Sequence, residues 1–292
     1  AAEGVRFARA YTHAPFTAPA HASLLTSLLT PSHGVYGWAE KLDARALTLA
    51  ERFAAAGYRT AAFYNNPGLQ NSGMTRGFET ERRFYFETAD VTVDAFLDWL
   101  DDPHGKGGGG PAFCAWVHLW DVHRPYAWRD WRPEWLRERV GQRDPPFFAY
   151  GEELFGDPPA LEVGRHEGFY NLNEEKRATP LRVGATERLL DAADIAYVRE
   201  RYDAGVLHAD RGLGRLTAGL RERGLYERTA IAVTSDHGES LTERDACYFT
   251  HDPFLYEETL RVPLVMRFPE GRYAGTVVES LARGIDVLPA LR

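Results

Sequence analysis

The chain has 292 residues, 44% of them hydrophobic and 26% charged, a composition typical of a globular protein with a buried core rather than of a disordered chain. Its 42 acidic residues outnumber its 34 basic ones, for a net charge of -8, which argues against broad binding to nucleic acid. Two cysteines are too few for a disulfide framework or a thiolate metal cage. No stretch reaches the roughly 18 apolar residues that a membrane span needs.

The first half of the chain alternates predicted helices and strands. Apolar residues at helical spacing, ended by a glycine, predict a helix over residues 42–56, and an apolar strand follows over residues 58–64. A second helix is predicted over residues 91–100 and a second strand over residues 112–119. The periodicity is then lost, and residues from about 128 to 187 are rich in aromatic side chains, which predicts a long irregular insertion.

The second half returns to the same alternation. A long helix is predicted over residues 191–223, short apolar strands over residues 229–234 and 261–268, and the start of a helix over residues 285–291. Helices that alternate with apolar strands predict an α/β fold, with a mainly parallel central sheet and helices on both of its faces.

Polar side chains follow three of the predicted strands. Because ligands of such a sheet bind at the carboxyl ends of its strands, we expect these side chains to gather at one edge and to bind a metal ion or an anion. They are Asn65 and Asn66 after the first strand, Asp121 and His123 after the second, and Asp236 and His237 after the third.

The adjacent pair Asp236 and His237 has the chemistry of a cation site. A carboxylate and an imidazole at neighbouring positions can bind one cation if the backbone turns sharply, and Gly238 permits such a turn. The alternative is a capped turn at a strand end without a ligand. The same alternative applies to Asp121 and His123, which could lie in a solvated loop.

A short apolar helix with proline in its first turn begins near Thr17. A hydroxyl at this point faces the backbone donors and the positive end of the helix dipole, which suits an anionic ester. Thr17 is therefore a candidate nucleophile. The alternative is that Thr17 or a neighbour only caps the helix.

Several segments of the chain carry motifs in a recognisable order. They are Gly4-Val-Arg-Phe-Ala-Arg-Ala-Tyr11, Thr17-Ala-Pro-Ala-His-Ala-Ser-Leu-Leu-Thr26, Pro31-Ser-His-Gly-Val35, Gly57-Tyr-Arg-Thr-Ala-Ala62, Arg76-Gly-Phe78, His118-Leu-Trp-Asp-Val-His-Arg-Pro-Tyr126, Thr234-Ser-Asp-His-Gly-Glu239 and Leu255-Tyr-Glu-Glu-Thr-Leu-Arg-Val-Pro-Leu264. In this order they resemble the sulfatase family of the alkaline phosphatase superfamily, over nearly the whole chain outside the insertion. The resemblance implies an alkaline phosphatase-like fold and a metal-dependent hydrolase of sulfate or phosphate esters.

The resemblance also implies roles for single residues. Thr17 stands where the family carries its nucleophile, and Asp236 and His237 match the metal-binding pair, usually of calcium, with Thr17 as a third contact. His251 falls where a Lys or His touches the ester oxygens, which implies a catalytic and substrate-binding role. His123 matches the family's substrate-binding histidine.

Two departures from the family pattern change the expected chemistry. Formylglycine forms in the family from Cys or Ser followed by x-Pro-x-Arg, whereas Thr17 and His21 stand at those positions here. Threonine cannot give the aldehyde, so no formylglycine is expected, and a metal-bound Thr alkoxide is instead the nucleophile of relatives that cleave phosphate esters or transfer phospho groups. The family's Lys-x-His is replaced by Tyr64-Asn65-Asn66, which weakens the positive clamp expected on the ester oxygens; by position in the resemblance, Asn65 and His21 are candidate substrate-binding residues.

A third departure concerns the metal site. The family's first strand ends in an Asp-Asp pair that binds the metal and precedes the Gly4–Tyr11 segment, and this chain has no counterpart. Asp236, His237 and Thr17 alone fall short of the six or more oxygen-type ligands that calcium prefers. We therefore expect residues 1–292 to be one catalytic domain truncated at both ends, with weak metal binding and little activity by itself.

Three functions remain open from the sequence. The first is a sulfatase-family hydrolase of small-molecule or glycan esters, with a single calcium ion. The second is a Thr-nucleophile phosphoesterase or phosphotransferase, with a zinc or manganese pair that could include Asp121 and His123. The third is a catalytically silent binding protein that uses the aromatic insertion to hold a sugar or a partner.

Overall fold

The computed structural model describes residues 2–70, 72–85, 87–102, 112–123, 126, 181–183, 186–188, 192–244, 247–251 and 254–291. The chain divides into two compact units. The first comprises Ala1–Leu119, Gly212–Glu239 and His251–Arg292, and the second comprises Trp120–Arg211 and Ser240–Thr250. The expectation of one truncated catalytic domain over residues 1–292 stays a prediction.

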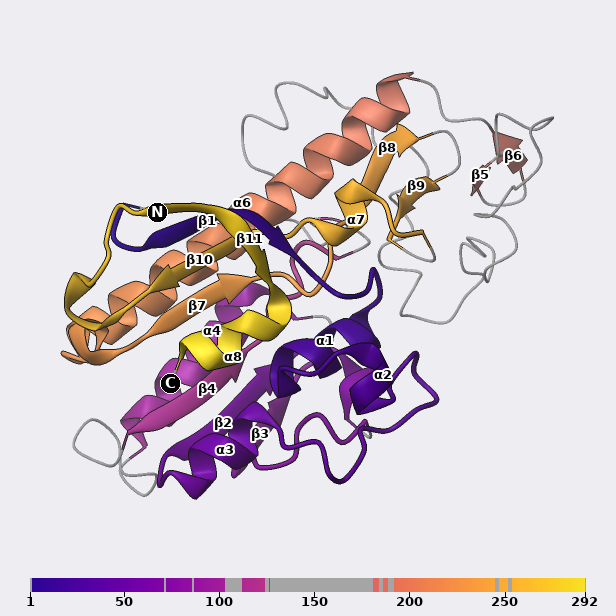
Figure 1. The fold of residues 1–292 in the computed structure, drawn as a ribbon. Helices are drawn as coiled ribbons and strands as arrows, with labels where there is room; N and C mark the ends of the chain where they lie inside the picture. The colour runs from indigo at the N-terminus through magenta and orange to yellow at the C-terminus, as the bar shows by residue number, and fades with distance from the viewer. Residues whose placement is uncertain are drawn as a thin grey trace. The chain divides into compact units, whose positions relative to one another are not determined.

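A mixed four-stranded sheet forms one half of the first unit (Figure 1). Its strands, in spatial order, are β11 (Val277–Arg283), β1 (Val5–Tyr11), β10 (Leu264–Arg267) and β7 (Ile231–Thr234). Strand β1 is parallel to β11, whereas β10 is antiparallel to both of its neighbours. The expected α/β fold is therefore present, but the expectation of a mainly parallel sheet is corrected here, because apolar periodicity does not specify the direction of a strand.

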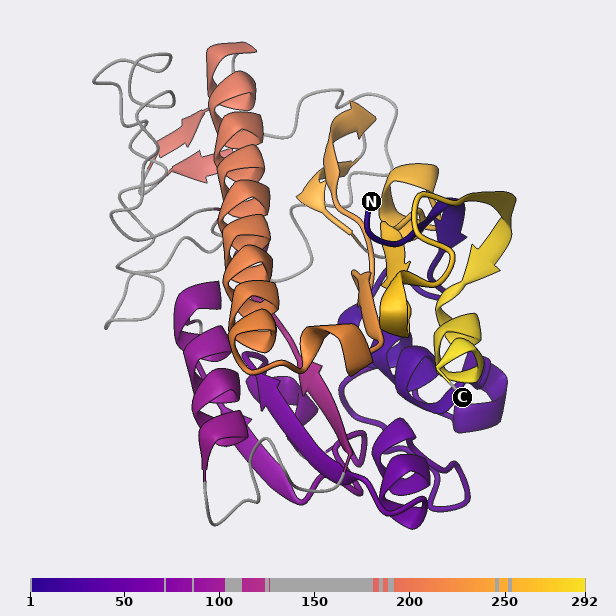
Figure 2. The same ribbon diagram turned by 90° about the vertical axis from the view of Figure 1, so that its left-hand side faces the viewer.

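A second sheet in the same unit is wholly parallel. Its order is β3 (Thr80–Arg83), β2 (Arg59–Tyr64) and β4 (Phe113–Val117). The side chains of β2 alternate between two hydrophobic clusters: Ala62 and Tyr64 pack on one face, and Ala61 and Phe63 on the other. The predicted cover on both faces holds for this sheet (Figure 2).

Five of the described helices follow the predicted order with shifted ends, and the short helices α2 and α7 were not predicted. The described helices are α1 (Thr17–Thr26), α2 (Thr30–His33), α3 (Leu49–Ala55), α4 (Ala89–Asp101), α6 (Ala192–Glu222), α7 (Glu257–Leu260) and α8 (Val287–Ala290). Helices α1 and α3 contribute to the cluster around Ala62, and α4 and the last turns of α6 contribute to the cluster around Ala61. None of the helices that the structure describes is long and apolar enough to cross a membrane.

Helix α3 begins seven residues later than the apolar pattern of residues 42–56 predicts, at Leu49. Thr48 accepts a hydrogen bond from the Glu51 backbone N–H, and the Glu51 carboxylate accepts one from the Thr48 backbone N–H, which forms a capping box. Leu42 and Ala46 are buried in the loop before this cap. The spacing of buried apolar residues in this loop therefore resembles that of a helix, although the loop is not helical.

Short elements complete the described chain. They are η1 (Pro67–Leu69), η3 (Tyr226–Arg228), η4 (Pro269–Gly271) and η5 (Gly284–Asp286), with β8 (Ser240–Arg244) paired to β9 (Cys247–Thr250) and β5 (Leu181–Val183) paired to β6 (Thr186–Arg188). The predicted insertion at about 128–187 lies outside the described residues apart from β5 and the start of β6.

Four strands of the first unit, β3, β4, β7 and β11, have an edge with no partner among the described strands, and two of these edges, those of β4 and β7, concern the same hydrophobic cluster. Among the described strands, none pairs with the outer edge of β4 or of β7. The apolar residues of both strands are only half-buried, whereas residues 60–64 of the central strand β2 are buried. The cluster around Ala61 includes side chains of both β4 and β7, so the two open edges border the same part of the core.

Candidate active site

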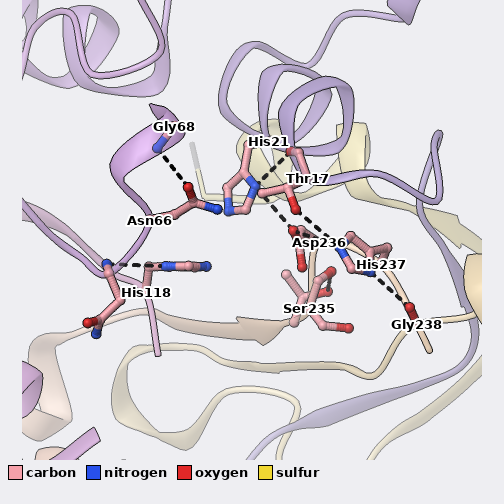
Figure 3. Close-up of polar contacts among 11 residues, drawn as sticks. Thr17, His21, Asn66, Gly68, His118, Ser235, Asp236, His237 and Gly238 are labelled. Atoms are coloured by element: carbon pink, nitrogen blue, oxygen red, sulfur yellow. Dashed lines mark hydrogen bonds and ion pairs between the residues drawn. The ribbon is translucent and has the colours of Figure 1, made fainter. Parts of the chain in front are cut away.

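The hydroxyl of Thr17 lies at the first residue of α1 and is not a cap. The N-cap position is Phe16, and no side chain caps the helix there. Thr17 is 5% exposed, and its Oγ1 lies 3.3 Å from Nε2 of His237. The capping alternative for Thr17 is thereby excluded, and the hydroxyl is directed at the residues that follow β7 (Figure 3).

A backbone carbonyl sets the proton position on His237. Its Nδ1 lies 2.8 Å from the carbonyl oxygen of Gly238, and because that oxygen can only accept, Nδ1 carries the proton. Burial lowers the pKa of His237 below its ordinary value, against the pull of the Asp236 carboxylate, so the ring is neutral at pH 7. Its Nε2 lone pair then accepts the hydrogen bond of the Thr17 hydroxyl.

Asp236 is surrounded by imidazoles. Its Oδ2 lies 3.3 Å from Nδ1 of His21 and 3.4 Å from Nε2 of His237. Burial by itself raises the pKa of Asp236, but the neighbouring imidazoles, led by His237 and His21, bring the net pKa below its ordinary value. The carboxylate is therefore ionised at neutral pH.

His21 links this carboxylate to the helix of the nucleophile. Its Nδ1 also lies 2.9 Å from the Thr17 backbone oxygen, which can only accept, so Nδ1–H is shared between that oxygen and Asp236. His21 is 2% exposed. The position predicted to bind substrate therefore also positions Thr17 and Asp236 relative to each other.

Gly238 lies against the backbone of α7, and it does not adopt a left-handed conformation. Its φ is outside the positive range found at other glycines. A Cβ at this position would collide with the backbone carbonyl oxygen of Glu258, and the Gly238 N–H donates to the Thr259 carbonyl oxygen at 2.8 Å. Close approach of two backbones, rather than turn geometry, is what requires glycine here.

His251 stacks on the opposite side of His237. The two ring centroids are 4.0 Å apart with an interplanar angle of 27°. Nδ1 of His251 lies 3.5 Å from Oε1 of Glu239, and its ring is buried. The structure thus brings His251 to the group formed by Thr17, Asp236 and His237.

His118 belongs to the same group, although the sequence did not single it out. It follows β4, and its ring makes an edge contact with that of His21 at 5.1 Å between centroids. The Asn65 backbone N–H donates to its Nδ1 at 3.5 Å. The sequence signal for His118 is its position at the end of a strand, as for Asp236. After this strand, only Asp121 and His123 are predicted from the sequence to reach the site.

Asn65 and Asn66 have different surroundings. The Asn65 side chain is fully buried, donates to Thr92 Oγ1 at 2.7 Å and accepts from the Glu87 backbone N–H at 2.7 Å. Asn66 accepts from the Gly68 N–H at 2.9 Å, and its amide points toward His21 in Figure 3. The structure therefore places Asn66 at the group, and it gives no support to Asn65 as a substrate-binding residue.

Asp121 and His123 belong to the second unit. Asp121 Oδ1 forms a buried hydrogen bond with Nδ1 of His208 in α6, and the His123 ring stacks on Trp120 at 3.8 Å. The role of His123 in binding substrate stays a prediction.

The sulfatase family model matches residues 1–291. The chain belongs to the sulfatase family. That family lies within the alkaline phosphatase superfamily, and the α/β fold of this chain agrees with it.

Relatives and solved structures agree with this family at low identity. An arylsulfatase of Clostridium perfringens (strain 13 / Type A) is 23% identical over 328 residues, 100% of this chain and 67% of the relative. The phosphonate monoester hydrolase of Agrobacterium radiobacter has a TM-score of 0.71 at 20% identity, over 99% of this chain and 66% of that one. A structure bound to its substrate D-glucosamine-2-N,6-O-disulfate has a TM-score of 0.67 at 20% identity, over 100% of this chain and 69% of that one. The sulfatase-family chain thus spans about two thirds of these relatives.

Members of the sulfatase family typically use a divalent metal ion. The Nε2 lone pair of His237 and the Asp236 carboxylate face each other at 3.4 Å beside Thr17 Oγ1, and two acceptors at this separation suit a shared cation. Yet within the described ranges no group of three or more His, Cys, Asp or Glu side chains could hold a metal ion. The described residues therefore do not make a complete metal site by themselves.

Proposed function

We propose that this sulfatase-family chain hydrolyses sulfate or phosphate esters with the Thr17 hydroxyl as nucleophile. The observation that carries the proposal is the pairing of Thr17 Oγ1 with the unprotonated Nε2 of His237 at 3.3 Å. A hydroxyl becomes a better nucleophile when a neighbouring base accepts its proton. Its place at the start of α1 also puts the reacting group against backbone N–H groups and the positive end of the helix dipole.

The chain's own residues have distinct roles in this proposal. Thr17 Oγ1 forms a bond to sulfur or phosphorus, its proton passes to His237 Nε2, and the ester oxygen leaves. The ionised Asp236 stabilises the protonated His237 and holds His21 in place. His251, stacked on His237, is the candidate to protonate the leaving oxygen, and Asn66 and His118 are candidates to bind the ester oxygens. Water then releases the bound group from Thr17.

Thr17 itself supports a second candidate, a phosphoesterase or phosphotransferase. Threonine cannot be converted to formylglycine, so its oxygen must act as an alkoxide. A phosphoryl or sulfuryl group fits the same arrangement of donors. We therefore keep both substrate classes, and the resemblance to glycan-sulfate and aryl-ester relatives extends the proposal to small-molecule and glycan esters.

Calcium is the metal that we propose for the complete site, with zinc or manganese if phosphate esters are the substrates. Asp236 and Thr17 would contribute ligands, and His237 would be a third through Nε2 only while that atom is not accepting the Thr17 proton, because one lone pair cannot bind a cation and a proton together; calcium prefers six or more ligands, mostly oxygens. We propose that the remaining ligands lie on a strand between β4 and β7. The support is that both open edges end at the site, β4 at His118 and β7 at Asp236.

Replacing Thr17 tests the nucleophile. We expect Thr17→Ala in the full-length protein to lower kcat by about 10³-fold or more, while Thr17→Ser retains measurable turnover, because serine keeps the hydroxyl. Aryl sulfate and aryl phosphate are assayed side by side, after chelation and with added Ca²⁺, Zn²⁺ or Mn²⁺. Unchanged turnover in Thr17→Ala would remove Thr17 from this role, and absence of turnover with every metal would favour a silent binding protein.

A further inference from the structure

A half-exposed tryptophan packs against two residues that are close in sequence to residues of the candidate site. Trp38 is 46% exposed, and its ring makes an edge contact with Phe16 at 5.3 Å between centroids and an interplanar angle of 77°. Phe16 immediately precedes Thr17 and is the N-cap of α1. One neighbour of the indole is therefore covalently adjacent to the proposed nucleophile.

The other neighbour of the indole is a glycine next to Asn66. A Cβ at Gly68 would lie 2.6 Å from Cζ3, 2.8 Å from Cε3 and 3.0 Å from Cη2 of Trp38. Real Cβ atoms do not approach a ring so closely, so the six-membered ring of the indole rests directly on the Gly68 backbone. The Gly68 N–H in turn donates to Asn66 Oδ1 at 2.9 Å.

The indole is thus in contact with two separate segments of the chain, at Phe16 and at Gly68. Phe16 is covalently bonded to Thr17. Gly68 donates a hydrogen bond to Asn66, whose amide points toward His21 (Figure 3). Two fixed contacts hold the ring rigid, yet nearly half of its surface stays exposed. Burying that flat surface against another ring stabilises a complex without a large loss of side-chain entropy.

We propose that Trp38 is a stacking platform for the leaving group of the ester, and that the leaving group it selects is a planar aromatic ring. This inference rests on the proposed function, since it places the ester group at Thr17 and the leaving group over the indole. Stacking between aromatic rings contributes beyond the area that it buries. A saturated alkyl leaving group offers no such face, so the platform discriminates between ester classes.

Tyr36, which lies in the same loop as Trp38, provides a control that distinguishes a stacking role from simple surface packing. Tyr36 is 61% exposed in the same loop, and among the described aromatic pairs it has no ring partner. An exposed aromatic of the loop that only covers apolar surface would behave like Tyr36 on substitution. Tyr36→Ala is therefore the matched control for Trp38→Ala.

The test measures binding without turnover. Benzenesulfonate and methanesulfonate share the anionic group and differ in the ring, as do phenylphosphonate and methylphosphonate. In the full-length protein we expect the aryl member of a pair to bind about tenfold more tightly than the methyl member by calorimetry. Trp38→Ala removes this preference, Trp38→Phe keeps most of it, and Tyr36→Ala changes it by less than about twofold.

Gly68→Ala provides an independent variant. The added methyl displaces the indole without removing it, so the aryl preference falls although Trp38 is still present. Equal affinities for aryl and methyl anions in the wild type, or an aryl preference that survives Trp38→Ala, would overturn the platform. Turnover and binding measured together in the wild type separate the two proposals: a Trp38-dependent preference in a wild-type protein that turns over no ester with any metal supports the platform and rejects the hydrolase, whereas turnover without that preference does the reverse.

Discussion

A backbone carbonyl oxygen accepts a hydrogen bond and a backbone N–H donates one, so each sets the proton position on the imidazole that it contacts. The Gly238 carbonyl oxygen holds the proton on Nδ1 of His237 and leaves Nε2 for Thr17. In the reverse sense, the Val35 N–H donates to Nδ1 of His33 at 3.1 Å, so His33 Nε2 carries the proton and donates to Ser23 Oγ at 3.0 Å. His33 is therefore a structural residue and cannot activate Ser23.

The buried His33 should make stability depend on pH. Burial lowers its pKa from 6.5 to about 4, so between these values the unfolded chain binds a proton that the folded chain does not. The free energy of unfolding should therefore fall by about 3 kcal/mol as the pH drops from 6.5 to 4. Urea unfolding across this range measures the loss.

Two variants isolate this effect from other titrating groups. In His33→Gln the fall between pH 6.5 and 4 should be shallower than in the wild type. Ser23→Ala removes the hydrogen bond to Nε2 but keeps the imidazole buried, so the slope should persist. Identical slopes in His33→Gln and the wild type would contradict the prediction.

Side-chain direction decided which polar residues reach the site. Asn65 and Asn66 follow the same strand, yet one side chain is turned into the core toward Thr92 and the other toward His21. The alternation of a strand predicts that neighbours point apart. Which of the two faces the site depends on how the sheet packs, and the sequence pattern does not contain that choice.

At the scale of elements, one face of α6 contacts residues between positions 120 and 126, which belong to the second unit, as this part of α6 does. Arg201, Gly205 and His208 are spaced by four and three residues, so they share a helix face. Arg201 donates to the Tyr126 carbonyl oxygen at 3.0 Å, and His208 pairs with Asp121. A Cβ at Gly205 would collide with the Asp121 carbonyl oxygen.

Two glycines of the same helix should respond in opposite ways to alanine. Gly205→Ala should destabilise the protein by about 2 kcal/mol, because the cost of the collision exceeds the gain in helix propensity. Gly214 is exposed with open space at its Cβ position, so Gly214→Ala should stabilise the protein by about 0.5–1 kcal/mol. Urea unfolding of both variants checks this, and equal shifts would refute the close approach at Gly205.

At the scale of the whole chain, the open edges of β4 and β7 are the main departure from the predicted single sheet. In a parallel strand alternate residues bond to opposite sides. The His118 N–H donates to the Phe63 carbonyl oxygen, and the Ala112 carbonyl accepts from the Arg59 N–H. Cys114 therefore bonds toward β2, and Ala115 faces the open edge.

Proline substitutions at Cys114 and Ala115 should show whether another strand pairs with the open edge of β4. In the 292-residue chain Ala115→Pro should cost less than about 1.5 kcal/mol, because its N–H makes no bond to β2, whereas Cys114→Pro should cost about 3 kcal/mol or more. In a longer protein whose extra strand pairs with β4, Ala115→Pro should become as costly as Cys114→Pro. Chemical unfolding of both lengths distinguishes the cases, and a large cost of Ala115→Pro in the short chain would contradict an open edge.

The order of the longer helices and of β2, β4, β7 and β10, the candidate nucleophile Thr17 and the pair Asp236–His237 could be read from the sequence, because they depend on local periodicity and on collinear motifs. The strands β1, β3 and β11 and the pairs β5–β6 and β8–β9 were not predicted, and the direction of β10 was not accessible, because pairing partners are set by contacts distant in sequence. The same reason applies to His118, Asn66 and the Asp121–His208 pair. Tertiary structure alone decided which polar side chains meet, since packing of sheets and helices orients each one toward the core, the site or another element.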